Sequence, residues 1–224
     1  MKLSVIIPVL NEKDTIAEIL KRVRAVPLDK EILVVDGGST DGTQQILEEE
    51  RKNGITVFSD EIRLGKGAAI KRALQYVTGD IVIIQDADLE YDPNEYPALI
   101  DPIISGRSNV VYGSRILRGI KVSSPVFYWG GRLVTLIANI LYGLKLTDVP
   151  TCYKVFRTET IKKIDLDCNN FEFCPEVTAK LAKMGEPILE VPISYVPRAT
   201  KMKKLKWWDG IVAIWALIKY RFVH

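Results

Sequence analysis

A cluster of carboxylates follows a short run of apolar residues. Ile81 to Ile84 are all β-branched, and Asp86, Asp88 and Glu90 come shortly after them. An unbroken run of this kind is typical of a strand buried on both faces of a parallel sheet, so the acids should lie where that strand ends. Carboxylates this close repel each other, and one would be partly protonated unless a cation lies between them. The spacing therefore indicates a site for a hard divalent ion, which takes one or two carboxylates together with water and phosphate oxygens.

A simpler interpretation of the bare Asp-x-Asp motif is a solvated turn ahead of Pro93. For that motif by itself, the turn is the more economical interpretation. The position at a strand end, the additional Glu90 and the motifs described below favour the metal site instead.

A second polar segment, Gly37 to Thr43, is rich in glycine and follows an apolar run that ends at Asp36. Glycines let a backbone approach a ligand closely, although the segment matches neither the GxGxxG of a dinucleotide fold nor a P-loop. We expect a nucleotide here, with Asp36 accepting hydrogen bonds from its base or ribose, while Asp86, Asp88 and a metal hold a diphosphate. The alternative for Asp36 is a structural role as a helix-capping acid.

Composition and charge exclude several classes of function. At 224 residues the chain can bury a substantial core, and a net charge of +3 is typical of neither a nucleic-acid-binding protein nor a protein with an acidic tail. Its basic residues gather late, between Arg198 and Lys206, where they could meet phosphates. The single histidine is His224, the last residue, so a Ser/His/Asp or Cys/His mechanism has no plausible base.

The cysteines and the amino terminus indicate the cellular compartment in which the protein is expected. Cys152, Cys168 and Cys174 show no spacing typical of a metal site, and an odd number does not suit a disulfide framework. We therefore expect a reducing cytoplasm. The apolar run within Met1 to Pro8 is too short for a signal peptide and is typical of a first strand.

Strands, polar turns and helices alternate along the first half of the chain. The expected strands are 3–9, 31–36, 55–58, 81–84 and 109–115, and the expected helices run from the N-cap Asn11 to about Val26, from Thr43 to about Asn53 and from Gly65 to Val77. The alternation predicts an α/β fold with a mostly parallel, Rossmann-like sheet flanked by helices, whose ligands bind at the carboxyl ends of the strands. Asp36, Asp86, Asp88 and Arg115 all lie at such ends.

Two apolar segments in the second half raise the question of a membrane. Pro125 to Leu146 is interrupted by Arg132 and Asn139, and a central arginine costs about 2.5 to 3.5 kcal/mol on insertion scales. We predict one or two amphipathic helices there, packed on the sheet or touching lipid. Ile211 to Ile218 is too short to span a bilayer. A membrane interface would suit the residues that flank it, which are Trp207, Trp208, Lys219 and Arg221.

Motifs spread over nearly the whole chain are similar, in order, to those of a known family. They are Val5–Glu12, Val34–Thr43, Gly65–Ala68, Asp86–Pro93, Gly113–Arg115, Thr147–Asp148, Thr151–Phe156 and Pro175–Lys180. On these motifs the chain resembles family 2 glycosyltransferases with the GT-A fold, and within them the polyprenyl-phosphate (dolichol-phosphate) sugar transferases of the mannosyltransferase kind. The resemblance implies a single domain over residues 1–224, with a nucleotide-sugar-binding half at 1–115, an acceptor-binding half at 116–205 and a C-terminal membrane-interface or packing helix at 206–224.

The resemblance also implies roles for the motif residues. Nucleotide-sugar contacts would come from Pro8, Asn11, Glu12, Asp36, Lys66, Asp86, Arg198, Lys203 and Lys204. Asp86 and Asp88, with Glu90 as a candidate third ligand, would bind Mg²⁺ or Mn²⁺ on the diphosphate. Arg115 and Arg132 would receive the lipid phosphate. Catalysis would therefore depend on the two aspartates and these two arginines.

The implied chemistry accounts for the missing general base. A polyprenyl monophosphate is largely dianionic near neutral pH, because its second pKa is about 6, so it can attack without giving up a proton. The resemblance implies in-line attack on the anomeric carbon of a GDP-mannose or UDP-glucose type donor, with inversion. We expect a peripheral enzyme on the cytoplasmic face of a membrane, acting alone or with a membrane-protein partner, and no nucleic acid as partner.

The sequence departs from the family pattern at three places. Asp36 to Ser39 lacks a second acid, which leaves the identity of the base open. Cys174 replaces an acid on the acceptor side. Lys201 and Met202 replace a Glu-Glu-Gly ahead of the paired lysines, so this loop would close differently or bind anionic lipid more strongly.

Two alternatives remain open. A transferase with a soluble hydroxyl acceptor would need a base, for which Asp148 or Glu176 could serve, although such an acceptor has no anion for the two arginines to hold. A non-catalytic nucleotide-sugar-binding subunit would bind its partner without needing the paired aspartates.

Overall fold

The computed structural model describes residues 1–59, 65–119, 125–198 and 207–223. The strands are β1 (Leu3–Val9), β2 (Lys30–Asp36), β3 (Thr56–Ser59), β4 (Ile81–Ile84), β5 (Val110–Ser114), β6 (Lys154–Arg157) and β7 (Ile188–Pro192). The helices are α1 (Ile16–Ala25), α2 (Thr43–Arg51), α3 (Lys66–Leu74), α4 (Tyr96–Ile104), α5 (Pro125–Tyr142), α6 (Thr158–Lys162), α7 (Phe173–Lys183) and α8 (Trp207–Phe222), with a short 3₁₀ turn at Pro93–Glu95.

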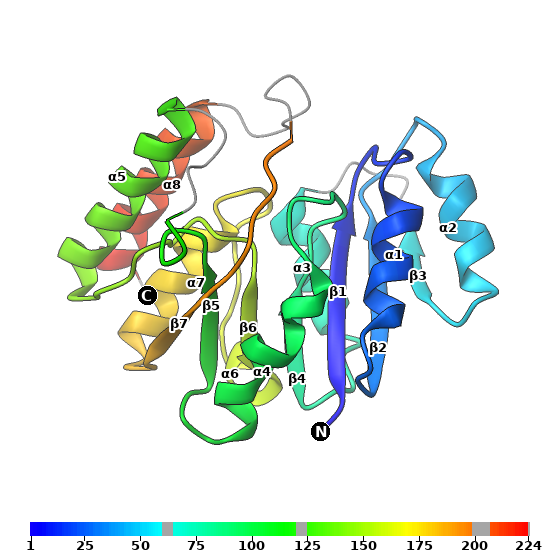
Figure 1. The fold of residues 1–224 in the computed structure, drawn as a ribbon. Coiled ribbons are helices and arrows are strands. Elements are labelled where there is room, and N and C mark those ends of the chain that lie inside the picture. The colour runs from blue at the N-terminus through cyan, green and yellow to red at the C-terminus, as the bar shows by residue number, and fades with distance from the viewer. Residues whose placement is uncertain (60–64, 120–124, 199–206, 224) are drawn as a thin grey trace.

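The described strands form one mixed sheet in the order β3-β2-β1-β4-β6-β5-β7 (Figure 1). Pairs among β1 to β4 are parallel, and β5 pairs parallel with β7. β6 runs antiparallel between β4 and β5. The expected α/β class, with a mostly parallel sheet flanked by helices, is confirmed.

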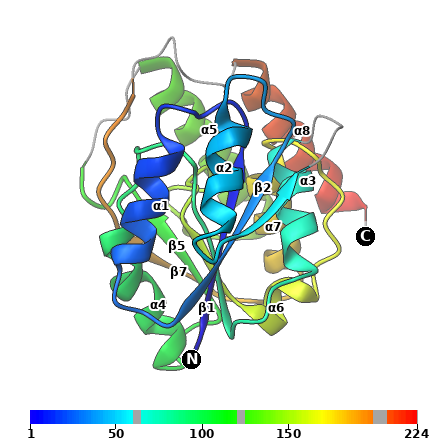
Figure 2. The same ribbon diagram turned by 90° about the vertical axis from the view of Figure 1, so that its right-hand side faces the viewer.

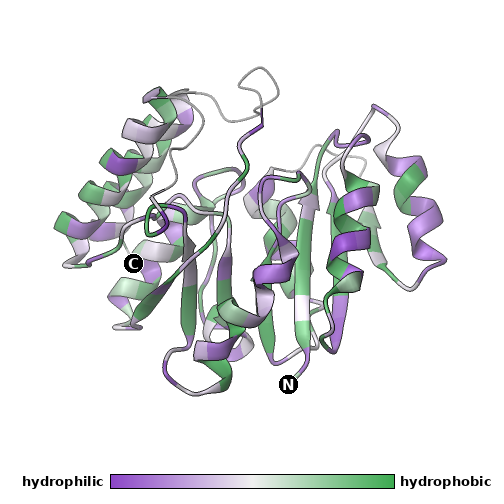
Figure 3. Cartoon of the chain, in the orientation of Figure 1, coloured by the Kyte–Doolittle hydropathy of each residue, from purple (hydrophilic) through white to green (hydrophobic). Residues whose placement is uncertain are grey.

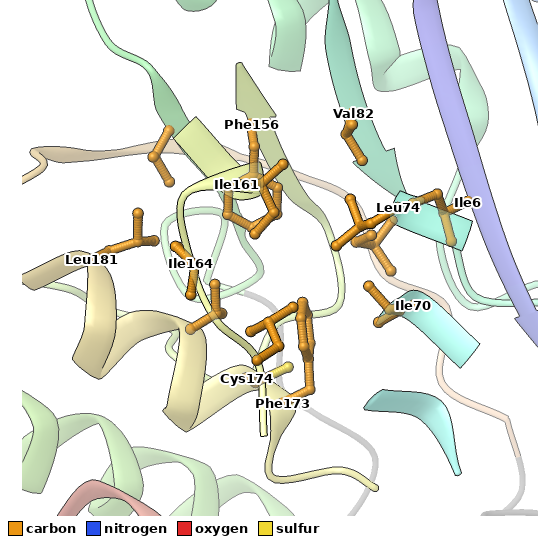
Figure 4. Packing of buried hydrophobic residues seen from close by; sticks show 14 of the residues in the cluster. Ile6, Ile70, Leu74, Val82, Phe156, Ile161, Ile164, Phe173, Cys174 and Leu181 are labelled. Atoms are coloured by element: carbon orange, nitrogen blue, oxygen red, sulfur yellow. The ribbon is translucent and has the colours of Figure 1, made fainter. Parts of the chain in front are cut away.

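The core lies on both faces of this sheet because successive side chains of a strand point to opposite sides. In β1, Val5 and Ile7 join the core under α1 and α4, whereas Ile6 joins the core under α3 and α7. Figure 2 shows the two helix layers, and Figure 4 shows Ile70 and Leu74 of α3 packing near Ile6. Burial on both faces explains why β4 is hydrophobic throughout and β1 is largely so (Figure 3).

The first helix begins later than predicted. Asn11 is not its N-cap, because α1 starts at Ile16 and is preceded by Thr15 as N-cap. Asn11 instead adopts φ 50, in the left-handed region that asparagine tolerates. Its Oδ1 accepts a hydrogen bond from the backbone N–H of Thr40 at 2.8 Å, so Asn11 joins the loops that follow β1 and β2.

The last two strands were not predicted. Lys154–Arg157 and Ile188–Pro192 are short, and they pair with strands that are distant in the sequence. Because β6 is antiparallel, the loop before it reaches the edge where β4 and β5 end. That loop contributes several side chains to the site described below.

The segment from Pro125 forms one helix, α5, which packs against α8 at one end of the molecule (Figure 1). Each of these helices leaves a row of large apolar side chains exposed. The row on α5 is Val126, Trp129, Leu133, Leu136 and Ile140, and the row on α8 is Trp208, Ile211, Val212, Trp215, Ile218 and Phe222. We call these two rows the apolar face. In the described ranges, no helix combines the length and hydropathy that crossing a bilayer requires.

Candidate active site

A cleft of about 940 Å³ opens at the edge where β1, β4 and β5 end. It brings together most residues singled out from the sequence. The predicted residues that line it are Pro8, Asn11, Glu12, Lys66, Asp86, Asp88, Glu90, Arg115, Arg132 and Arg198. Asp36 is not among the lining residues, and Lys203 and Lys204 lie outside the described residues.

Asp86 is paired with a lysine that comes from the start of α3. Lys66 Nζ lies 2.5 Å from Asp86 Oδ1 and 3.1 Å from Cys152 Sγ. Burial would raise the pKa of Asp86, but the charge of Lys66 and its hydrogen bond lower it, so this carboxylate stays ionised. Asp86 therefore lines the cleft as a carboxylate whose negative charge is partly neutralised by Lys66.

Asp88 differs from Asp86 in its electrostatics. Burial, followed by the charges of Asp86 and Glu90, raises the pKa of Asp88 to about 7. Its Oδ1 accepts a hydrogen bond from Glu90 N at 3.1 Å. The repulsion expected from two close carboxylates is thus present, and it acts on the second aspartate.

Arg198 provides the positive charge nearest to this second carboxylate. Its Nη2 lies 3.2 Å from Asp88 Oδ2, and its Nη1 donates to both carboxylate oxygens of Glu12 at 3.0 and 3.2 Å. Its backbone N donates to Glu90 Oε1 at 3.0 Å. Three acids from two different loops thus hold one arginine that lines the cleft.

Oxygen donors of this kind suit a hard divalent ion, and Glu90 as a third ligand stays a prediction. Among the described residues, no three His, Cys, Asp or Glu side chains are placed to hold a metal ion together. Glu90 is correspondingly turned to the backbone of Arg198. The donor set therefore fits a site with Asp86 and Asp88 as protein ligands, completed by water and phosphate oxygens.

The start of α3 is fixed by close backbone packing. A Cβ on Gly65 would lie 2.3 Å from Asn169 O, and a Cβ on Gly67 would lie 2.4 Å from Cys168 O. The backbone N–H of Gly67 donates to Asn170 O at 3.1 Å. The glycines on either side of Lys66 thus let the 168–170 segment pack against the start of α3. The first backbone amides of this helix are therefore already paired with that segment, and the helix start contributes only the Lys66 side chain to the site.

On the other side of the cleft, Arg115 follows β5 and forms a two-pronged ion pair. Its Nε and Nη2 each lie 2.7 Å from the Asp148 carboxylate, and its guanidinium stacks on the Tyr195 ring. Glu190 of β7 in turn accepts hydrogen bonds from the backbone N–H groups of Thr147 and Asp148, at 2.7 and 2.9 Å. Arg115 is therefore largely committed to protein partners.

Arg132 of α5 is less committed. Its Nη1 donates to Thr147 O at 3.0 Å, and within the described part of the chain it forms no ion pair with a carboxylate. The nearby wall of the cleft is apolar. It includes Ile116, Val126, Phe127, Val134, Phe171 and Ala213, which lead toward the apolar face of α5 and α8.

Asp36 is fully buried at the end of β2. Its carboxylate accepts hydrogen bonds from Ser39 N at 3.3 and 3.2 Å and from Gln44 Nε2 at 2.9 Å. In this arrangement the carboxylate orders the glycine turn, and it does not cap α2, whose N-cap is Gly42 without a side-chain cap. Direct contact with a base or ribose stays a prediction.

The two acids considered as bases for a hydroxyl acceptor are both engaged. Asp148 is held by Arg115, as described above. Glu176 is fully buried, and its carboxylate accepts hydrogen bonds from the backbone N–H groups of Asp167 and Cys168 at 2.6 and 2.9 Å and pairs with Lys180 at 2.8 Å. Asp148 lines the cleft but is held in its ion pair with Arg115, and Glu176 is not among the lining residues.

Three contributors to the cleft were not singled out from the sequence. Cys152 contacts Lys66, Tyr195 stacks on Arg115, and Glu190 orders the Thr147–Asp148 turn. Two of them had a signal in the sequence, because Cys152 lies in the family motif Thr151–Phe156 and Glu190 is an acid inside the apolar run Ile188–Pro192. Tyr195 had none, because it follows β7, whose position depends on pairing with the distant β5.

Comparison with known proteins agrees with this geometry. The model of the family described as glycosyl transferase family 2 matches residues 4–165. The chain belongs to glycosyl transferase family 2. The family expected from the motifs is thereby confirmed, and with it the expectation of a glycosyltransferase at the level of the family.

This glycosyltransferase is similar to curated proteins along most of its length. It is 29% identical to the undecaprenyl-phosphate mannosyltransferase of Micrococcus luteus over 95% of the chain and 90% of that protein. It is 32% identical to the dolichol-phosphate mannosyltransferase of Pyrococcus furiosus, over 92% of the chain. A low-salt glycan biosynthesis hexosyltransferase of Haloferax volcanii is 31% identical over 99% of the chain. The chain spans only 60% and 53% of the latter two relatives.

Among solved structures, it resembles glucosyl-3-phosphoglycerate synthase from Mycobacterium tuberculosis, in a complex with Mn²⁺, uridine diphosphate and glucosyl-3-phosphoglycerate. The TM-score is 0.79 at 21% identity, over 100% of this chain and 81% of that one. At this level of identity the likeness shows the fold alone. The expected GT-A fold is confirmed.

Proposed function

We propose that this protein transfers a hexose from a nucleotide sugar to a polyprenyl phosphate, with a divalent metal and with inversion at the anomeric carbon. The observation that carries the proposal is the composition of one cleft. The same cleft is lined by the paired aspartates, by Arg115 and Arg132, and by apolar side chains that include Val126 of the apolar face. The two mannosyltransferase relatives are named for undecaprenyl phosphate and dolichol phosphate, which supports this acceptor class.

The donor would lie against the loops that follow β1 and β4. Pro8, Asn11 and Glu12 line that part of the cleft, together with Lys66. Asp86 and Asp88 would hold Mg²⁺ or Mn²⁺. When bound, such an ion supplies positive charge that stabilises a departing nucleoside diphosphate. Lys66, already charged and buried beside Asp86, would add to that stabilisation from the protein itself.

The acceptor would enter from the opposite side. Among the described residues Arg132 has no carboxylate partner and could hold an anion, whereas Arg115 would act mainly by holding Asp148 and Tyr195 in place. A phosphate dianion requires no general base, which agrees with the engagement of Asp148 and Glu176 in ion pairs. An acceptor hydroxyl would lack a proton acceptor at these two positions.

We also propose that the apolar face meets a membrane surface on the cytoplasmic side. Its exposed side chains include Trp129 at 68% and Trp215 at 58% exposure, and tryptophans favour the boundary between lipid headgroups and acyl chains. Exposed Lys219 and Arg221 at the end of α8 would meet anionic headgroups. A polyprenyl chain could then reach the cleft without leaving the lipid. A membrane-protein partner could cover the same face.

The deciding experiment measures transfer of radiolabelled sugar from a panel of GDP- and UDP-sugars into organic-extractable polyprenyl phosphate. Mn²⁺ or Mg²⁺ is supplied, and wild type is compared with Asp88→Ala. We expect extractable counts that disappear with EDTA and in the variant. Donor turnover without extractable counts would favour a soluble acceptor. Failure to bind or turn over any donor would favour a non-catalytic subunit.

A further inference from the structure

Arg198 contacts a carboxylate oxygen that a metal ion on Asp88 would need. Its guanidinium contacts Asp88 Oδ2 at 3.2 Å and both oxygens of Glu12, and its backbone N–H contacts Glu90. Its side chain is only 19% exposed. A divalent ion on Asp88 and a guanidinium on the same carboxylate repel each other, so the two cations compete for one place.

The arrangement leaves Arg198 incompletely satisfied. Its Nε is buried and has no hydrogen-bond partner among the described residues. A buried donor without an acceptor costs free energy, which the side chain would recover on meeting another acceptor. Phosphate oxygens are well suited, because an arginine fork can donate to two of them at once. A nucleoside diphosphate in the cleft would offer such oxygens.

We propose that Arg198 is an internal counter-ion that holds the metal's place, so that a divalent cation binds tightly only together with a nucleoside diphosphate. In the empty cleft Arg198 balances the acids. When the nucleotide arrives, its phosphates draw the guanidinium away from Asp88 and free that carboxylate for the metal. This inference rests on the proposed function, because it takes Asp88 as a metal ligand.

The inference has a thermodynamic consequence that can be measured without turnover. Nucleotide and metal must increase each other's affinity by the same factor, since coupling between two ligands is reciprocal. Competition between Arg198 and the metal for Asp88 would account for much of this mutual increase in affinity. Removing its charge should strengthen binding of the metal alone and weaken the dependence on nucleotide.

The test is a titration of Mn²⁺ into the full chain, following the electron paramagnetic resonance signal of free Mn²⁺. It is run with the metal alone and with saturating UDP or GDP. For Arg198→Gln we expect Mn²⁺ alone to bind at least about tenfold tighter than to wild type, and the enhancement by nucleotide to shrink by a similar factor. Arg198→Lys keeps the charge, so its affinity for Mn²⁺ alone should stay within about threefold of wild type.

Arg107→Gln serves as the matched control for the loss of one positive charge. Arg107 is exposed, pairs with Asp101, and lies just before β5, at the opposite edge of the sheet. Its affinity for Mn²⁺ should equal that of wild type. Equal gains in Arg107→Gln and Arg198→Gln, or no gain in Arg198→Gln, would overturn the inference. A larger rise of Tm with Mn²⁺ in Arg198→Gln than in wild type would confirm that the folded variant binds the ion.

Asp88→Asn separates this inference from the function on which it rests. If wild type binds Mn²⁺ with nucleotide and Asp88→Asn does not, the metal site is correct and Arg198→Gln tests the counter-ion alone. If wild type binds no Mn²⁺ with either nucleotide, the proposed metal site itself is wrong, and the counter-ion role is wrong with it.

Discussion

At the scale of single residues, the two arginines of the acceptor side differ in what they already bind. Arg115 is paired with buried Asp148, whereas Arg132 donates to a backbone carbonyl and, within the described ranges, has no carboxylate partner. A guanidinium without a carboxylate partner retains its charge for a ligand. The two positions should therefore respond differently to substitution.

For Arg132→Gln we expect the KM for polyprenyl phosphate to rise by about 10- to 100-fold, because a hydrogen bond to a charged group contributes about 1.5 to 3 kcal/mol. The KM for the nucleotide sugar should stay nearly constant. Steady-state kinetics with each substrate varied in turn make the comparison. The exposed Arg118 pairs with Glu95, so Arg118→Gln is the control and should change neither value. A selective rise in the donor KM would contradict this assignment of Arg132.

For Arg115→Gln we expect a loss of stability, because breaking a buried ion pair costs about 3 to 5 kcal/mol. The Asp148 side chain is 4% exposed, so its charge would be left without a partner away from water. Urea unfolding of Arg115→Gln and Arg132→Gln gives the contrast, since the second variant should unfold close to wild type. Equal midpoints for the two variants would show that the Arg115 pair is not structural.

At the scale of elements, α3 supplies Lys66 only because its first turn fits against the 168–170 segment. Gly67→Ala would place a Cβ 2.4 Å from a backbone oxygen, which cannot move as easily as a side chain. We expect destabilisation by about 1 to 3 kcal/mol, as for other overpacked sites. The control is Gly130→Ala on α5, where a Cβ meets nothing within 4 Å. Helix propensity predicts that this variant is neutral or up to about 1 kcal/mol more stable in denaturant unfolding.

Helices α5 and α8 carry the exposed apolar face defined above. A water-exposed face this rich in tryptophan and aliphatic residues is unusual, and a lipid surface would cover it. For the double variant Trp129→Glu, Trp215→Glu we expect at least a tenfold loss of binding to vesicles that contain anionic lipid, measured by flotation. Transfer to a short, water-soluble prenyl phosphate should persist. Wild type that does not float with vesicles would exclude a direct lipid contact and favour a protein partner.

At the scale of the whole molecule, an acid at the other edge of the sheet ties several strands together. Glu31, in β2, pairs with Lys2 and accepts hydrogen bonds from Ser4 of β1 and from Thr78, which precedes β4. Burial by itself would raise the pKa of Glu31, but these hydrogen bonds lower it from 4.5 to about 2. The edge opposite the cleft is therefore stabilised by a charge.

This depressed pKa makes a prediction about stability and pH. The folded protein holds the Glu31 proton more weakly than the unfolded chain, so the contribution is complete above about pH 4.5 and is lost as the pH falls toward 2. Allowing for solvent screening, we expect Glu31→Gln to cost about 1 to 2 kcal/mol at pH 7 and little near pH 2. Unfolding curves at both pH values test this. A cost that does not depend on pH would show that shape, rather than charge, matters at this position.

Local patterns in the sequence determined much of the fold. The β-branched runs at β1, β2 and β4 predict buried parallel strands, because a strand covered on both faces has no polar side. The loops after those strands then had to meet at one edge. The strand ends therefore predicted Asp86, Asp88 and Arg115 at a common edge, and the family resemblance added Glu12 and Arg132; all five line the cleft. Asp36 was predicted at the same edge but does not line the cleft.

Only the tertiary structure decided how these groups are paired. The antiparallel insertion of β6 brings Asp148 to Arg115 and Cys152 to Lys66, and Arg198 reaches Glu12 across most of the chain. Residue types show which side chains can ionise or donate, because that is local chemistry. Which charge neutralises which depends on contacts between distant segments. Such contacts are set by strand order and packing, and no pattern within one segment records them.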